Sequence, residues 1–135
     1  MAASGEKRRL QRVEPDYPVI GQLPAGNVVI VDLSIVGARV EHQFALAAGR
    51  RVRLDFACEG ESISLLCDVT RCKLQRGSGR TGVVYASGLR FCDPPESSAA
   101  ALKRVITGFL VRKLAARKEA RSGLSQSPMA AAAGR

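Results

Sequence analysis

Hydrophobic and polar residues alternate along most of residues 18–91, a pattern typical of strands that bury one face. The alternation is clearest in residues 50–58, where Val52, Leu54 and Phe56 stand between charged neighbours. Turns that contain glycine separate the later alternating segments. We therefore predict strands at residues 18–23, 27–34, 38–43, 50–58, 62–74 and 82–91.

The alternation also predicts which side chains share a face, because successive residues of a strand point to opposite sides. In residues 62–74 one face carries Ile63, Leu65, Cys67 and Val69. In residues 27–34 the inner face is expected to carry Val29, Val31 and Leu33. The outer face of that strand then carries Val28, Ile30, Asp32 and Ser34.

A helical pattern replaces the alternation after residues 94–98, PPESS. Apolar residues recur there at helical spacing: Leu102, Val105, Ile106, Phe109 and Leu110. We expect this helix to pack against the strands; a helix that binds a partner or a membrane surface is the alternative. Residues 1–5 are predicted to be a flexible N-terminus, and residues 122–135 a disordered tail.

The order of these elements favours a mainly β fold. Many short strands before any helix are typical of an antiparallel barrel or sandwich. A chain of 135 residues suits a small closed barrel, which leaves no strand edge exposed. No apolar run approaches the ~20 residues that cross a bilayer, and the N-terminus lacks the apolar segment of a signal peptide. We therefore expect a cytoplasmic protein without a membrane span.

Composition narrows the classes of function. The formal net charge of +9 predicts attraction to an anion, whether nucleic acid, a nucleotide or an acidic membrane, although a merely well-solvated surface also fits. The four cysteines form no CxxC motif and there is one histidine, so we expect no metal site. Small buried hydrophobic side chains are the simpler account of the cysteines. His42 has no partner in a catalytic motif, so we expect no catalytic residues and no enzyme.

Residues 32–37, DLSIVG, combine an acid, a hydroxyl and a glycine directly after an apolar run. A carboxylate at Asp32 can accept hydrogen bonds from the Watson–Crick edge of a guanine, and Ser34 can donate or accept. Gly37 allows a sharp turn or the close approach of a ligand. The same three residue types are also routine in hairpin turns, and taken alone they favour that interpretation.

Residues 7–12, KRRLQR, place four cations within six positions. Arg8 and Arg12 are four residues apart, and Arg9 is adjacent to Arg8. A guanidinium is a planar fork that matches two phosphate oxygens or the O6/N7 edge of guanine. This arginine arm could therefore close over a guanine nucleotide bound beside Asp32. A solubilising arm, or a nonspecific tether to nucleic acid, is the alternative.

The two motifs together resemble those of PilZ domains. Arg8 and Arg12 match the RxxxR motif of that family, and Asp32, Ser34 and Gly37 match its D/N-x-S-x-x-G motif. The segment ASGLRF, residues 86–91, is similar to the last barrel strand of the family. The resemblance covers residues 6–93 with a helix following, so a PilZ domain is expected over residues 6–121. The sequence departs from the family pattern at Val36, where many relatives have a second glycine directly before the position of Gly37.

The resemblance implies a six-stranded antiparallel β-barrel that acts as a receptor for the bacterial second messenger cyclic di-GMP, with no other cofactor. It implies that Arg8 and Arg12 bind guanine and phosphate, that Asp32 and Ser34 bind polar edges of a guanine, and that Gly37 permits the turn. Arg9 would add charge to the site. Lys7 and Arg39 are further candidate contacts.

We expect ligand binding to order the arginine arm and so to signal to a partner protein, an effector that the sequence does not identify. One alternative is a small basic barrel that binds nucleic acid. The aromatic content of 4% argues against nucleic acid, because single-strand binders stack bases on aromatic side chains. The other alternative is a PilZ adaptor that binds no nucleotide, against which the intact motif residues weigh.

Overall fold

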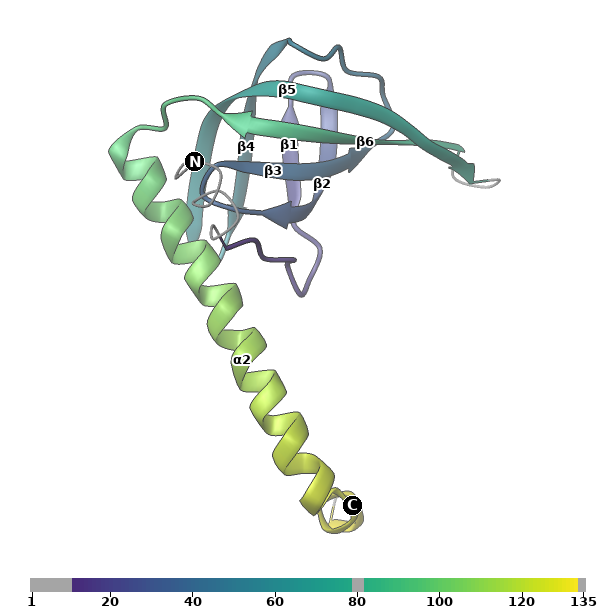
Figure 1. Cartoon of the computed structure of the whole chain (residues 1–135), viewed down its shortest axis with the longest axis vertical. Helices are drawn as coiled ribbons and strands as arrows, with labels where there is room; N and C mark the ends of the chain where they lie inside the picture. The colour runs from purple at the N-terminus through teal and green to yellow at the C-terminus, as the bar shows by residue number, and fades with distance from the viewer. Residues whose placement is uncertain (1–10, 79–81, 134–135) are drawn as a thin grey trace, which may run out of the picture.

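Six antiparallel strands close into a barrel in the computed structural model, which describes residues 11–78 and 82–133, with side chains up to residue 120 except those of 76–78. The order around the barrel is β1-β2-β3-β6-β5-β4 (Figure 1). The strands are β1 (Ile20–Leu23), β2 (Gly26–Leu33), β3 (Gly37–His42), β4 (Arg51–Cys58), β5 (Glu61–Ser78) and β6 (Gly82–Phe91). The predicted closed barrel with a helix after it is confirmed.

The barrel interior is aliphatic, as the scarcity of aromatic residues requires. Val40, Leu54 and Leu65 are fully buried, and the face predicted for β5 is the buried one. Cys67 shares this face, and burial raises the pKa of its thiol to about 12. All four cysteines are free, and Cys67 is the one that is completely buried. The core is therefore built from inward-facing strand residues, as a barrel of this size requires.

The face prediction for β2 is partly wrong, because the strand contains a β-bulge. Val28 and Ile30 are buried, whereas Val29 is 38% exposed. The register with β3 shifts between Ile30 and Asp32, so Val31 is an extra residue on this strand. An extra residue reverses the alternation beyond it, which returns Leu33 to the core. A period-two pattern cannot reveal this shift, since the bulge is defined by the pairing with β3.

Helix α2 (Glu96–Ala133) covers one end of the barrel with its first turns. Its buried stripe is the predicted one, including Leu102, Val105 and Phe109, so the packing prediction is confirmed. The rest of α2 extends away from the barrel (Figure 1). The backbone of α2 is helical to Ala133, and so its last turns fall within residues 122–135. The predicted disorder of that tail stays a prediction. No helix in the described part of the chain is long and apolar enough to span a membrane.

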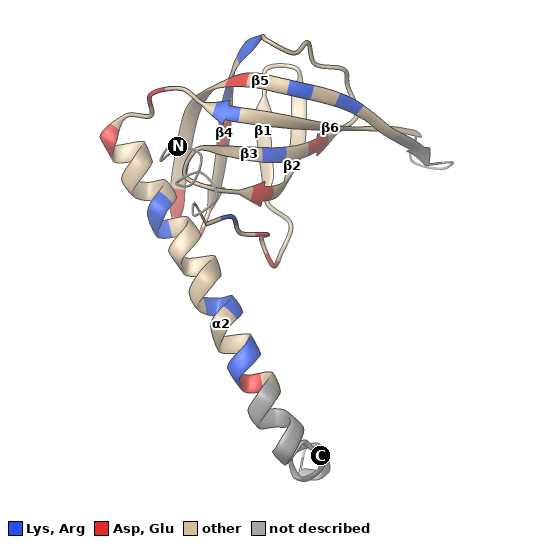
Figure 2. Ribbon diagram, in the orientation of Figure 1, with Lys and Arg blue, Asp and Glu red and all other residues tan. Residues whose placement is uncertain are grey.

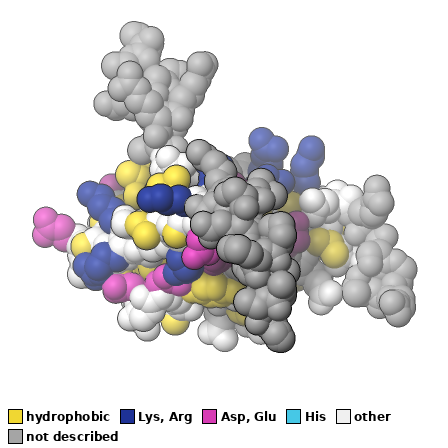
Figure 3. Space-filling model, turned by 90° about the horizontal axis from the view of Figure 1, so that it is seen from below, with side chains coloured by type: hydrophobic (Ala, Val, Ile, Leu, Met, Phe, Trp, Pro, Cys, Tyr) yellow, Lys and Arg dark blue, Asp and Glu magenta, His cyan; other side chains and the backbone are white. Residues whose placement is uncertain are grey.

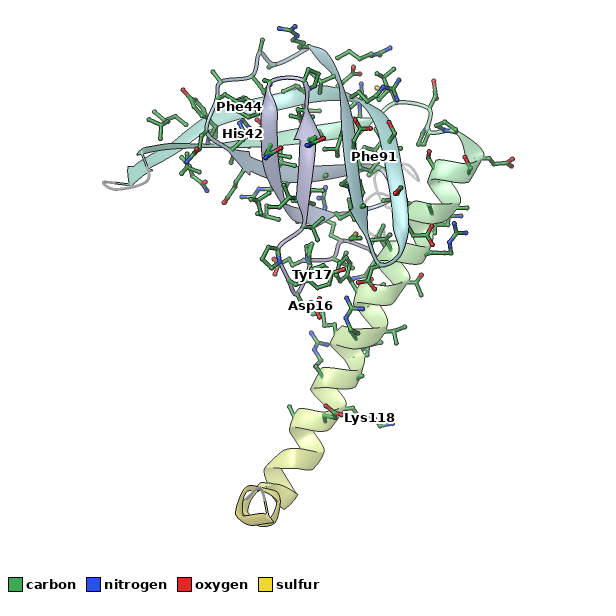
Figure 4. The ribbon with its side chains drawn as sticks, turned by 180° about the vertical axis from the view of Figure 1, so that it is seen from behind. Asp16, Tyr17, His42, Phe44, Phe91 and Lys118 are labelled. Carbon is green, nitrogen blue, oxygen red and sulfur yellow. The ribbon has the colours of Figure 1, made fainter. Side chains whose placement is uncertain are left out.

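A polar cluster ties the chain before β1 to α2. Arg112 of α2 donates to Glu59 in the β4–β5 turn at 2.7 and 2.9 Å, and to Asp16 at 3.1 and 3.2 Å. Tyr17 also donates to Glu59 and lies, with Phe109, beside the Arg112 guanidinium. Figure 4 shows Asp16 and Tyr17 next to the helix, and Figure 3 shows cationic beside acidic side chains at this end. We call these residues the Arg112 cluster.

Candidate functional site

A pocket of about 880 Å³ lies on the outer wall of the barrel, over β2, β3, β6 and β5. Among the described residues that line it there are five cations and a single acid, Asp32. The cations are Arg12, Arg39, Arg71, Lys73 and Arg90. Figure 2 shows basic residues on β3 and β5, on either side of β6. This cationic pocket is suited to an anionic ligand that also offers hydrogen-bond donors to one carboxylate.

Arg12 and Asp32 meet at the edge of the cationic pocket. The Nη1 atom of Arg12 donates to Oδ1 of Asp32 at 2.9 Å. The Arg12 side chain is 58% exposed, and that of Asp32 is 18% exposed. The structure thus brings together one residue from each of the two sequence motifs, as the sequence predicts for a shared site.

The neighbouring residue Val13 fixes the backbone that carries Arg12. Val13 donates its N–H to the carbonyl of Leu33 at 2.8 Å and accepts from the N–H of Leu33 at 2.9 Å. The Val13 side chain is buried in the core. Arg12 is therefore held beside β2 by a short antiparallel bridge, and its side chain does not depend on the Asp32 contact alone to stay near the pocket.

Ser34 is not on the outer face where the alternation places it. It is 1% exposed, and its hydroxyl oxygen accepts hydrogen bonds from the N–H groups of Val36 and Gly37, both at 3.2 Å. The hydroxyl also donates a hydrogen bond to the Gly37 carbonyl oxygen at 3.3 Å. These bonds satisfy backbone groups that would otherwise be unpaired in the tight β2–β3 turn. Ser34 therefore shapes the loop beside Asp32 in this structure.

Gly37 is required by the neighbouring backbone. A Cβ atom at this position would lie 2.4 Å from the carbonyl oxygen of Leu89 on β6. Any side chain would thus push β3 away from β6, where the two strands pair. The sequence predicts a sharp turn or the close approach of a ligand, whereas the structure shows the close approach of a neighbouring strand at the pocket wall.

Of the remaining predicted site residues, Arg39 lies on β3 and lines the cationic pocket. Lys7, Arg8 and Arg9 lie outside the described residues. Sequence reasoning did not single out Arg71, which also lines the pocket. Alternation from Val69 assigns Arg71 to the inner face, and only the pairing of β5 with β6 shows otherwise.

His42 has a structural place at the end of β3. It is 4% exposed, and its two ring nitrogens lie 2.7 Å from the Phe44 carbonyl oxygen and 2.8 Å from the Ser87 hydroxyl. Burial lowers its pKa, which favours the neutral ring. His42 also packs beside Phe44 (Figure 4). Within the described ranges, no three His, Cys, Asp or Glu residues are grouped as metal ligands would be.

Comparison with known proteins identifies the fold. The family model described as PilZ domain matches residues 6–108. The PilZ domain of YcgR from Escherichia coli, solved with c-di-GMP, is 18% identical with a TM-score of 0.64; the match covers 85% of this chain and 98% of that one. The PilZ domain of CeSA from a cellulose-synthesizing bacterium is 20% identical with a TM-score of 0.51, covering 73% of this chain and 96% of that one.

A longer protein has the same fold in part. The Bacillus subtilis inhibitor of motility, MotI/DgrA, is 16% identical with a TM-score of 0.60. The match covers 76% of this chain but 52% of that one, so this chain spans about half of its length. A search of curated proteins gave no match.

Proposed function

The chain belongs to the PilZ domain family, and from this we propose that it is a receptor for cyclic di-GMP, which it binds in the cationic pocket beside Arg12 and Asp32. The ligand carries two negative charges, which suit the five cations of the pocket wall. Its guanine bases carry N–H donors, which suit the one carboxylate there.

The Arg12–Asp32 pair is the observation that carries this proposal. A solvent-exposed ion pair contributes only about 0–1 kcal/mol, so a ligand can replace it at little cost. A guanine that donates to Asp32 releases the Arg12 guanidinium, which then binds the guanine edge or a phosphate of the same ligand. Both members of the pair therefore exchange one weak contact for stronger contacts to the ligand.

The other motif residues have supporting roles. Arg8 and Arg9 precede Arg12 in the arginine arm and supply further guanidinium groups to the ligand, with Lys7 adding charge. Gly37 keeps the pocket wall flat by allowing β3 and β6 to approach closely. Ser34 acts mainly by fixing the loop that follows Asp32, since its hydroxyl is buried and bonded to that loop.

The proposed output is a change in the arginine arm that a partner protein recognises. The arm leads through Val13 into Asp16 and Tyr17, which belong to the Arg112 cluster. Closing the arm over a ligand costs on the order of 1 kcal/mol or more per ordered residue, which the charged contacts offset. The closed arm and the adjoining barrel wall then form the surface that a cytoplasmic effector binds.

The Asp32→Ala variant tests the function by isothermal titration calorimetry with cyclic di-GMP. The change removes a negative charge from a cationic pocket, so a site that attracts anions only by charge would bind more tightly. We expect affinity to fall by about tenfold or more instead, because a guanine loses its charged acceptor.

The matched control is Asp55→Ala, since Asp55 is an exposed acid on β4, outside the cationic pocket. Its affinity should stay within about twofold of the wild type. Unchanged or tighter binding by Asp32→Ala would refute the guanine contact. Such a result, combined with tight and strongly salt-dependent binding of random oligonucleotides, would favour the nucleic-acid barrel.

A further inference from the structure

Four residues on four neighbouring strands form one row across the floor of the cationic pocket. Asp32 of β2 is opposite Arg39 of β3, and Arg39 is opposite Gly88 of β6. Gly88 is in turn opposite Arg71 of β5. Strands in a sheet are about 4.8 Å apart, so the row extends for ~14 Å from the motif acid to Arg71. We call it the Asp32–Arg71 row.

Both ends of the row are set by β-bulges. Val31 is the extra residue beside Asp32, and Thr70 is the extra residue beside Arg71. Without the extra residues, the alternation from the buried Ile30 and Val69 would give inward positions to both Asp32 and Arg71. Bulges often re-aim a side chain next to a binding site. The two bulges place opposite charges at the two ends of one outward-facing row.

Gly88 separates the two arginines of the row. It has no side chain, and a Cβ there would lie 2.7 Å from the hydroxyl oxygen of Thr70. That hydroxyl donates to the Gly88 carbonyl at 3.1 Å, which fixes the bulge against β6. Arg39 and Arg71 therefore lie on strands on either side of Gly88, about two strand spacings or ~10 Å apart.

These two arginines are available for a ligand, unlike their neighbours. Arg51 and Arg90 both donate to Asp68 at 2.9 Å, which lowers the pKa of that carboxyl to about 2. Among the described residues, neither Arg39 nor Arg71 has an acid within ion-pair distance. Both are exposed, and Lys73 adds a third such cation to the same wall. Unpaired guanidinium groups that line the same pocket are suited to phosphate oxygens.

We infer that Arg39 and Arg71 form a second anion subsite across Gly88, which binds a phosphate of the ligand whose guanine is held by Asp32. This inference rests on the proposed function, since it places one cyclic dinucleotide along the Asp32–Arg71 row. The first guanine lies at the Asp32 end, and the ring phosphates extend toward Arg71. Arg71 is thereby a ligand contact outside both sequence motifs.

Calorimetry with cyclic di-GMP on Arg71→Ala and Arg71→Lys tests the subsite. Arg71→Ala should weaken binding by about tenfold or more, because charge-assisted bonds to phosphate are lost. Arg71→Lys should recover part of the loss, since it restores the charge without the fork. The matched control is Lys103→Ala, which removes the same charge from an exposed position on α2 and should stay within about twofold of wild type.

The outcomes distinguish a failure of the second subsite from a failure of the proposed function. If the wild type binds and Arg71→Ala binds within twofold of it, the second subsite is refuted and the proposed function stands. If Lys103→Ala weakens binding as much as Arg71→Ala, the effect is one of net charge and the subsite is again refuted. If the folded wild type binds no cyclic di-GMP at all, the proposed function fails, and the subsite with it. Circular dichroism of each variant checks that the barrel is intact.

Discussion

At the scale of single residues, the D-x-S-x-x-G motif divides into one partly buried acid at the pocket edge and two residues that shape the loop after it. Asp32 is at the pocket edge and paired with Arg12. Ser34 and Gly37 are buried in the turn between β2 and β3. The family resemblance implied guanine contacts for both Asp32 and Ser34, because a motif gives spacing and residue type but not burial. We therefore propose a direct role for Asp32 and, for Ser34, a role through the loop.

Replacing Gly37 tests the close approach of β3 and β6. Gly37→Ala would place a Cβ 2.4 Å from the Leu89 carbonyl oxygen, so the strands must separate. We expect a loss of roughly 2–4 kcal/mol in the free energy of unfolding, measured by urea denaturation, because backbone has to move in a packed wall.

Gly49→Ala is the matched control for this change. Gly49 has a φ of 88°, but a Cβ there meets nothing within 4 Å. It should therefore cost only about 1 kcal/mol of backbone strain. Equal losses in the two variants would show that the Leu89 contact does not constrain Gly37.

At the scale of elements, the sequence predicted every strand and the helix but not where the strands bulge. Alternation in β4 and the first part of β5 gives the buried face correctly, since both segments are regular there. It fails in β2 and at Arg71, because a single extra residue reverses the faces beyond it. Bulges are defined by the pairing with a neighbouring strand, and the alternation within one strand does not contain that information. The parts of the site that the sequence missed are therefore those that cross-strand pairing creates.

Asp68 links three strands of the barrel and makes the stability of the fold depend on pH at acidic values. It accepts from Arg51 of β4 and Arg90 of β6, and these bonds lower its pKa from 3.8 to about 2. Because the pKa of Asp68 is lower in the folded protein than in the unfolded one, the ionised carboxyl stabilises the fold at pH values above about 4. This stabilisation is lost as the pH falls from about 4 toward 2. We expect the thermal midpoint of the wild type to decrease over that range.

Asp68→Asn isolates this contribution. The variant should have a lower midpoint at pH 7 and a shallower decrease between pH 4 and 2, as followed by circular dichroism. The double variant Arg51→Ala with Arg90→Ala should behave similarly, since Asp68 then has no cationic partner to lower its pKa. A pH profile for Asp68→Asn that parallels the wild type would contradict the assignment.

At the scale of the whole molecule, one continuous path joins the cationic pocket to α2. The chain passes from Arg12, at the pocket, through the Val13 bridge to Asp16 and Tyr17. Arg112 then connects these residues to α2 and to the β4–β5 turn. Hydrogen bonds from Arg112 to Glu59 and Asp16 raise the pKa of Arg112 and lower the pKa of both carboxyls. The cluster therefore stays charged at neutral pH. The segment that carries Arg12 is therefore held against α2.

The central claim is that cyclic di-GMP binds on the wall formed by β2, β3, β6 and β5. Titration of the ¹⁵N-labelled protein with cyclic di-GMP, followed by two-dimensional NMR, tests this most directly, because each backbone amide reports its own surroundings. We predict saturable shifts at Asp32, Gly37, Arg39 and Gly88, with Ile20 and Ala57 on the opposite wall unaffected. Shifts confined to that opposite wall, or a spectrum unchanged by the ligand, would contradict the account.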